Sequence, residues 1–183
     1  MDHVANVESQ EVACTKNRQC DCVRAEEIIV RKTTSRDTDG IINVLKSTKL
    51  AEETWKGNER WVKRVLQKSL SDKNYTILVA ECDSTIIGFI NCIVFPSFWD
   101  WANQGMINHL FVHDAHQGKG VGAKLVRAIT KHADAENIAE MHVSTEWENV
   151  KARKLYGRYG FTEERLLLER SQETKVKSVY YKN

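Results

Sequence analysis

The sequence predicts a mixed α/β fold in which helices cover a mixed sheet. Three observations support this prediction. Strand-like and amphipathic segments follow one another in the order β-α-α-β-β-β-α-β-α-β-β. Two of the strands, at 75–81 and 86–95, are joined by a short polar turn, as in a β-hairpin. A glycine-rich turn at 117–122 lies between a strand and a helix, and the 183 residues suit one domain of ordinary size.

The first 24 residues lack a hydrophobic period, and we expect them to form a disordered extension before one folded domain over 25–183. The fold should begin with a short apolar strand at Glu27–Arg31. Ser35 then has the character of a helix N-cap, with Asp37 and Asp39 in the first turn, where acidic side chains suit the helix dipole. Apolar residues at helical spacing predict this helix and the next one: Ile41, Ile42, Val44 and Leu45, then Trp61, Val62, Val65 and Leu66.

The second half of the chain continues with strands and helices in turn. The hairpin should end at Pro96, since proline has no N–H to donate to a sheet. A further strand spans Met106–Val112, and the glycine turn leads from it into a helix with Leu125, Val126 and Ile129 on its buried side. The remaining expected elements are a strand at Ala139–Thr145, a helix at Asn149–Tyr159, and two strands near Phe161–Leu168 and Val176–Tyr181.

The composition excludes several classes of protein. The net charge of +2 gives no reason to expect nucleic acid as a partner. No apolar run approaches the roughly 18 residues that a membrane span needs. Residues 1–10 are polar and lack a signal core, so we expect a cytoplasmic protein. The cysteines include no CxxC pair, which favours reduced thiols over a zinc site: Cys14, Cys20, Cys22, Cys82 and Cys92.

The turn at 117–122 has the composition of a phosphate-binding site. Its glycines let backbone N–H groups converge without obstruction by a Cβ, and Lys119 adds a positive charge. The helix that follows offers unpaired N–H groups and the positive end of its dipole. The turn is not a P-loop, because GxxxxGK followed by Ser or Thr is absent. Gly118, Gly120 and Ala123 match the Rossmann pattern, but too little chain follows for the usual sheet, so an NAD-dependent oxidoreductase is a less favoured alternative.

A second pattern in the same turn is Gln117-x-x-Gly120-x-Gly122. It resembles the coenzyme A signature, Q/R-x-x-G-x-G/A, of the GNAT superfamily of N-acetyltransferases. Downstream, Asn149-x-x-Ala152-x-x-Leu155-Tyr156-x-x-x-Gly160-Phe161 resembles the second signature of that superfamily, N-x-x-A-x-x-L-Y-x-x-x-G-F. The resemblance covers about residues 27–183. Within the superfamily, Trp99-Asp100 and Thr145-Glu146 look most like histone and polyamine acetyltransferases of the fungal type.

The resemblance implies the GNAT fold, a central, mixed, mostly antiparallel sheet that is splayed between its fourth and fifth strands and flanked by helices. It also implies an acetyl-CoA-dependent enzyme that acetylates a primary amine by direct attack within a ternary complex. The pantetheine arm would pair with the backbone of Leu110, Phe111 and Val112, an N–H there would stabilise the oxyanion, and Asn149 would bind the same arm. The pyrophosphate would be held by the turn and the first helical residues: Gln117, Gly118, Lys119, Gly120, Val121, Gly122 and Ala123.

Acetyl transfer needs a neutral amine and an acid that protonates the departing thiolate. The resemblance assigns the role of this acid to Tyr156. A phenol has an ordinary pKa of about 10, which suits the protonation of a thiolate. The base stays open, because related polyamine enzymes have a glutamate where this chain has Asn108, which cannot accept a proton. A water relay, the adjacent His109 and Glu81 are the three alternatives. Neighbours on a strand face opposite sides, so His109 faces away from Asn108 unless a bulge rotates it.

The acceptor pocket of this family forms from the first two helices and the loop before the fourth strand. Here that material contains aromatic and acidic residues: Glu52, Glu53, Trp55, Trp99, Asp100 and Trp101. Such residues suit a cationic amine, so we expect a polyamine, a lysine side chain, an aminoglycoside or an amino acid. A CoA-binding module without catalysis is the main alternative. No metal site is predicted from His109, His113 and His116, and family members often dimerise through their C-terminal strands, which leaves a homodimer open.

Overall fold

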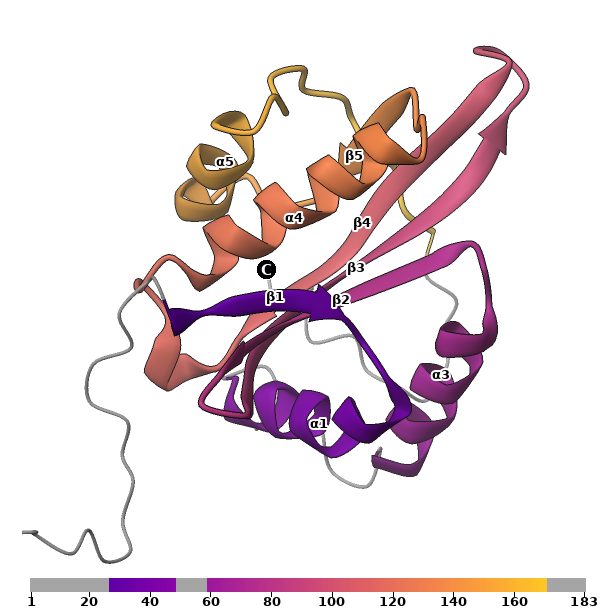
Figure 1. The fold of residues 1–183 in the computed structure, drawn as a ribbon. Coiled ribbons are helices and arrows are strands. Elements are labelled where there is room, and N and C mark those ends of the chain that lie inside the picture. Colours follow the sequence, from indigo (N-terminus) through magenta and orange to yellow (C-terminus); the bar gives the residue numbers. More distant parts are fainter. Residues whose placement is uncertain (1–26, 49–58, 171–183) are drawn as a thin grey trace, which may run out of the picture.

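The computed structural model describes residues 27–48 and 59–170 of the chain. Five strands form one sheet in the order β1-β2-β3-β4-β5. The first four strands pair antiparallel with their neighbours in sequence, and β5 joins β4 in parallel. Figure 1 shows α1 and α3 on one face of the sheet and α4 and α5 on the other. The predicted mixed α/β fold, with a mostly antiparallel sheet between helices, is confirmed.

The elements follow the predicted order up to the last helix. The strands are β1 (Ile29–Lys32), β2 (Tyr75–Cys82), β3 (Thr85–Ser97), β4 (Ala102–Val112) and β5 (Glu140–Val143). The α-helices are α1 (Thr38–Ser47), α3 (Glu59–Ser71), α4 (Val121–Ala135) and α5 (Val150–Gly157), and two short 3-10 turns are η2 (Ser35–Asp37) and η3 (Asp114–His116).

The entry to α1 differs from the prediction that Ser35 is the N-cap. Ser35 lies inside η2, and Thr34 precedes this turn in an extended conformation. Asp37 Oδ2 accepts hydrogen bonds from the Thr34 backbone N–H at 2.7 Å and from its hydroxyl at 3.0 Å. The same carboxylate accepts two bonds of 2.8 Å from Arg31, which also donates to Glu81 of β2 at 2.7 Å. Asp37 therefore joins β1, β2 and the start of α1.

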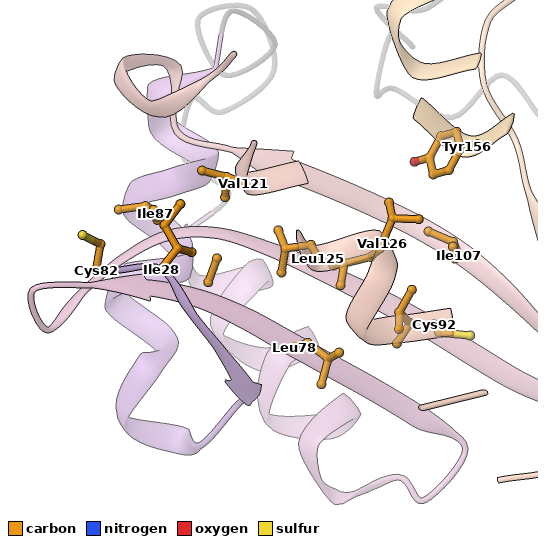
Figure 2. Close-up of a cluster of buried hydrophobic side chains, with 13 residues drawn as sticks. Ile28, Leu78, Cys82, Ile87, Cys92, Ile107, Val121, Leu125, Val126 and Tyr156 are labelled. Atoms are coloured by element: carbon orange, nitrogen blue, oxygen red, sulfur yellow. The ribbon is translucent and has the colours of Figure 1, made fainter. Parts of the chain in front are cut away.

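Two hydrophobic clusters hold the helices on the sheet. On the α4 side, Leu125, Val126 and Ile129 of α4 pack over β2, β3 and β4, and Figure 2 shows Leu78, Cys92 and Ile107 among their partners. On the opposite face, a second cluster joins α1 and α3 to the sheet: Ile41, Val44, Leu66, Ile77, Val79, Ile86 and Phe89. The glycine turn and the catalytic candidates thus rest on a sheet that is packed from both sides.

The β3–β4 hairpin is longer than predicted. β3 continues through Pro96 to Ser97, and β4 begins at Ala102 rather than at Met106. Pro96 lies opposite Asn103, one pair from the end of the ladder, where a missing N–H weakens little of the sheet. Four residues at the tip connect the two strands. The hairpin extends well beyond β2 at one end of the sheet (Figure 1).

The predicted strand at Phe161–Leu168 is wrong. The described residues after α5 contain no strand, and Leu166, Leu167 and Leu168 are exposed. Charged side chains interrupt the apolar pattern there, and they bind neighbouring elements instead: Glu164 pairs with Arg153 of α5, and Arg165 with Glu140 of β5. The extension at 1–24 and the strand at 176–181 lie outside the described residues.

Removal of the Asp37 carboxylate should lower the stability of the fold. We expect Asp37→Ala to reduce the free energy of unfolding by about 2 kcal/mol in a urea titration, because it removes the acceptor of two Arg31 hydrogen bonds and of the Thr34 amide. Asp39→Ala is the control, since Asp39 is an exposed residue paired with Lys63, and should cost less than about 0.5 kcal/mol. Equal losses in both variants would contradict the role of Asp37.

The same carboxylate predicts how stability depends on pH. Hydrogen bonds from Arg31 hold the pKa of Asp37 well below its ordinary value of 3.8. A lowered pKa in the folded state stabilises the fold above the ordinary pKa, and this contribution is lost as the pH falls through the lowered value. The difference in stability between the native chain and Asp37→Ala should therefore be constant above about pH 5 and shrink at lower pH.

Candidate active site

A β-bulge at Asn108 interrupts the middle of β4. Cys92 of β3 lies opposite Ile107, and the adjacent Asn91 lies opposite His109, so Asn108 has no cross-strand partner. One extra residue shifts the alternation of side chains along the strand by one position. Ile107 before the bulge and Leu110 beyond it consequently both pack into the α4-side cluster.

The bulge turns His109 onto the face of the sheet covered by α1 and α3. Its ring stacks on Phe111 with the centroids 5.9 Å apart and the planes at 20°. Its Nδ1 lies 3.2 Å from Oδ1 of Asn91. Desolvation by the surrounding atoms lowers the pKa of His109 below the ordinary 6.5, although part of the ring stays open to solvent. The imidazole is therefore neutral at pH 7 and has a nitrogen lone pair for a proton.

Beyond the bulge, β4 has an open edge on the side of β5. The pairing of β4 with β5 ends where Ile107 lies opposite Val143, which gives the predicted splay. The His113 N–H donates to the Ile87 carbonyl of β3 at 2.9 Å. Backbone groups of an antiparallel strand alternate in direction, so those of Phe111 also point to β3, whereas those of Leu110 and Val112 point to the open edge. Of the three residues predicted to pair with the pantetheine arm, only Leu110 and Val112 direct their backbone groups to this edge.

The glycine turn presents a run of unpaired N–H groups. Gly118 and Gly120 have left-handed φ angles of 76° and 82°, a conformation that residues with a Cβ rarely adopt. Gly120 is the N-cap of α4, and the N–H of Lys124 bonds to its carbonyl at 3.1 Å. Within the described chain, the N–H groups from 118 to 123 have no acceptor. Such a run at the positive end of a helix suits a phosphate group.

Gln117 and Gly122 fix where this turn lies relative to the open edge. The Gln117 side-chain amide donates to Asp114 Oδ1 at 2.7 Å and to the Val112 carbonyl at 3.3 Å. A Cβ at Gly122 would lie 3.5 Å from Leu155 and 3.9 Å from Leu110, so the first turn of α4 packs closely against β4 and α5. The phosphate site and the edge of β4 are therefore parts of one surface.

The two predicted residues of the second signature lie at opposite ends of α5. Asn149 is the N-cap, and its Oδ1 accepts from the Ala152 N–H at 3.1 Å, which leaves its amide N–H groups able to donate. Tyr156 is buried in the α4-side cluster (Figure 2). Its ring meets Phe161 edge to face, with centroids 5.6 Å apart. Burial raises the pKa of Tyr156 to about 12, so its phenol keeps its proton at neutral pH.

The predicted acceptor residues are not brought to the bulge. Trp99, Asp100 and Trp101 form the tip of the β3–β4 hairpin, where the two indoles are 90% and 91% exposed. At the usual rise of a strand, this tip is about 20 Å from Asn108. Glu81 binds Arg31 and lies beside the β2–β3 turn, and Glu53 lies outside the described residues.

Asn91 is the site residue that the sequence analysis missed. The sequence does contain a signal for this residue, because Asn91 is the one strongly polar side chain between Ile86 and Phe95 in β3. A lone polar residue in an apolar strand needs a partner, and here the partner is His109.

In 27–48 and 59–170, no cluster of three or more His, Cys, Asp or Glu side chains is placed to hold a metal ion. No helix within the same ranges is long and apolar enough to span a membrane.

Comparison with known proteins agrees with this geometry. The sequence profile of the acetyltransferase (GNAT) family matches residues 41–161. An uncharacterized N-acetyltransferase of Archaeoglobus fulgidus is 30% identical over 131 residues, which are 69% of this chain and 88% of that protein. A spermine/spermidine N(1)-acetyltransferase of Bacillus subtilis is 28% identical over 82 residues, 43% of this chain and 54% of the relative. An aminoglycoside N-acetyltransferase solved in complex with CoA has a TM-score of 0.65 at 19% identity, covering 79% of this chain and 95% of that one. The resemblance to the fungal type is not confirmed.

A carboxylate in the glycine turn should abolish the binding of CoA. Gly120→Glu places a negative charge beside the unpaired N–H groups and a side chain at a φ of 82°, and calorimetric titration with CoA should then show no binding. Gly120→Ala separates backbone strain from charge and should retain weakened binding. Gly157→Glu is the control, because a Cβ there meets nothing within 4 Å. Unchanged affinity in Gly120→Glu would remove the phosphate site from this turn.

Proposed function

The chain belongs to the acetyltransferase (GNAT) family and is an acetyl-CoA-dependent enzyme, and from this membership we propose that it acetylates the primary amine of a small cationic molecule with His109 as base and Tyr156 as acid. The observation that carries the proposal is the bulge at Asn108. It puts a neutral imidazole on one face of β4 immediately before Leu110, whose backbone N–H points to the open edge.

Acetyl-CoA would bind along the surface that joins the glycine turn to β4. The unpaired N–H groups of residues 118–123 suit its pyrophosphate, and the open edge at Leu110 and Val112 suits the amide groups of the pantetheine arm. The free amide N–H groups of Asn149 can donate to the same arm from the far side of the gap. The thioester would then lie at the bulge, between the two halves of the site.

The reaction follows from the protonation states of two side chains. An ammonium acceptor first loses a proton, which His109 Nε2 accepts through a water, and the amine nitrogen then attacks the thioester carbon. The Leu110 N–H stabilises the oxyanion of the tetrahedral intermediate. When the C–S bond breaks, the thiolate takes the proton of the Tyr156 phenol, which burial keeps in its protonated form. The second proton of the former amine nitrogen then passes through water to the Tyr156 phenolate, which leaves a neutral amide and restores the acid.

The cationic acceptor rests on two features. The spermine/spermidine acetyltransferase of Bacillus subtilis carries a polyamine in its name, and it matches 43% of this chain. On the α1/α3 face, the half-buried Phe111 stacks beside His109 and rests on the buried Phe89, with the two phenyl centroids 5.5 Å apart, and its apolar surface suits the methylenes of an alkylamine. The acidic partners of such an amine would come from Glu52 and Glu53, outside the described residues.

A thiol-release assay with acetyl-CoA tests this function. The amines are spermidine, an aminoglycoside, a lysine peptide, an amino acid and a neutral primary alkylamine as the control for charge. Release with spermidine or the aminoglycoside, and little with the neutral amine, supports the proposal. Binding of acetyl-CoA without thiol release on any amine would favour a CoA-binding module without catalysis, and release on the neutral amine alone would exclude a cationic acceptor.

Replacement of the phenol should slow turnover without weakening cofactor binding. We expect Tyr156→Phe to lower kcat by about a hundredfold, because the thiolate would leave without its proton. The KM for acetyl-CoA should stay within about twofold. Tyr159→Phe is the control, since Tyr159 is a phenol packed against the same cluster just beyond the end of α5, and it should retain the native rate. An unaltered kcat in Tyr156→Phe would remove this residue as the acid.

Replacement of His109 should change the pH dependence of the rate. A base acts in its deprotonated form, so kcat/KM of the native enzyme should fall as the pH drops through the lowered pKa of His109, below 6.5. His109→Gln should lower the rate by about a hundredfold and remove this acidic limb. Glu81→Gln tests the competing base and should keep the acidic limb of kcat/KM. Loss of this limb in Glu81→Gln, with the limb kept in His109→Gln, would assign the role of the base to Glu81.

A further inference from the structure

We propose that Asn91 of β3 is a positioning residue for acetyl transfer, whose side-chain oxygen holds His109 in the tautomer with a free Nε2 and does so without adding a charge. The proposal rests on the role of His109 as the base. Asn91 belongs to neither signature of the family, and its side chain bonds to His109 rather than to the glycine turn or α5.

The pairing of these two residues depends on the bulge. Side chains directly opposite each other on an antiparallel ladder have Cβ atoms about 5 Å apart, which is the reach of an Asn–His hydrogen bond. Asn91 lies opposite His109 only because Asn108 is the extra residue. Without the bulge, Asn108 would face Asn91, and His109 would point into the α4-side cluster. The β-bulge therefore both directs His109 to this face of the sheet and places Asn91 opposite it.

The chemistry of the contact decides the tautomer. An amide oxygen only accepts hydrogen bonds, so the Nδ1 atom, 3.2 Å from Asn91 Oδ1, must carry the proton. A neutral imidazole has one N–H, and its lone pair is then on Nε2. Stacking on Phe111 at 20° limits rotation of the ring, and Phe111 is held in turn by Phe89. These contacts thus determine that Nε2 is the nitrogen that accepts a proton, and they hold it in one direction.

The absence of charge from the partner is equally important. A carboxylate in place of Asn91 would favour the imidazolium and raise the pKa of the base. Among the described residues, no carboxylate bonds to His109. The charged groups of the elements on this face are Arg31 on β1, Glu81 on β2, Asp37 at the start of α1, Asp39 and Lys46 on α1, and Glu59, Arg60, Lys63, Arg64 and Lys68 on α3. All four acids of this set are paired with cations: Asp37 and Glu81 with Arg31, Asp39 with Lys63, and Glu59 with Lys46.

Two substitutions test the proposal in the full chain. Asn91→Leu keeps the volume and removes the acceptor, so kcat should fall by about tenfold with the KM for acetyl-CoA within about twofold. Asn91→Asp keeps the acceptor and adds a charge, so the acidic limb of kcat/KM should move up by about one pH unit. Asn103→Leu and Asn103→Asp are matched controls on the exposed part of β4, and both should leave the native profile unchanged.

A measurement independent of turnover reads the tautomer directly. In the cofactor-free protein, ¹⁵N NMR of the His109 ring should show the proton on Nδ1, a mixture of tautomers in Asn91→Leu, and an upward pKa shift of about one unit in Asn91→Asp. Native kcat and an unchanged tautomer in Asn91→Leu would overturn the proposal while leaving His109 as the base. A native rate and acidic limb in His109→Gln would overturn both assignments. A single tautomer with Nδ1 protonated, combined with the kcat loss in Asn91→Leu, supports the positioning role.

Discussion

The unpaired edge of β4 beyond Ile107 is the constraint on which the candidate site depends. The N–H and C=O groups of an unpaired strand edge make no hydrogen bonds within the sheet. Packing contacts elsewhere in the fold must therefore keep β4 and β5 apart. Parallel pairing with β5 ends at Val143, and the chain then turns away into the loop that leads to α5. Leu110 and Gly122 pack beside Leu155, so the first turn of α4 and the helix α5 fix the width of the gap. The opening is therefore part of the packed core rather than an irregularity at its border.

The rigid parts around this edge explain how a small site can be held in place. Gly105 has no room for a side chain, since a Cβ there would collide with the sulfur of Met141, and this close approach joins β4 to β5 just before the gap opens. On the opposite side, the ion-paired Asp37 joins β1 and β2 to α1. The Asp114 N–H bonds to the hydroxyl of Ser47 at 3.3 Å, so the end of α1 also contacts the segment that leads into the glycine turn. Both faces of the sheet thus support the same short length of β4.

The sequence predicts the parts of this site that depend on local rules. Glycines at positive φ, a helix that begins after them and an asparagine that caps α5 all leave a recognisable pattern within a few residues. The bulge leaves no such pattern, because the register of β4 depends on which residue of β3 lies opposite, and that choice is made by the packing of Cys92 and Ile107 against α4. The direction of His109 and its contact with Asn91 follow from that register, so neither could be predicted from local patterns in the sequence. The strand expected at 161–168 failed for a related reason, since apolar residues form a strand only where an edge is available and the ion pairs of Glu164 and Arg165 direct this segment elsewhere.

The polar groups at the bulge carry no net charge, and this has a consequence for acceptor selection. In the proposed mechanism the neutral imidazole of His109 takes the amine's proton and the Leu110 N–H binds the oxyanion, while the Asn91 amide only positions the imidazole, and none of these groups distinguishes a polyamine from a neutral alkylamine. Discrimination by charge must then come from side chains that contact the rest of the acceptor. The exposed face of α3 carries Arg60, Arg64 and Lys68, which repel cations, and the one acid of this helix, Glu59, is paired with Lys46. The proposed mechanism therefore separates chemistry from selectivity: β3 and β4 would supply the base and its tautomer, and recognition of the acceptor's charge would need side chains beyond the bulge.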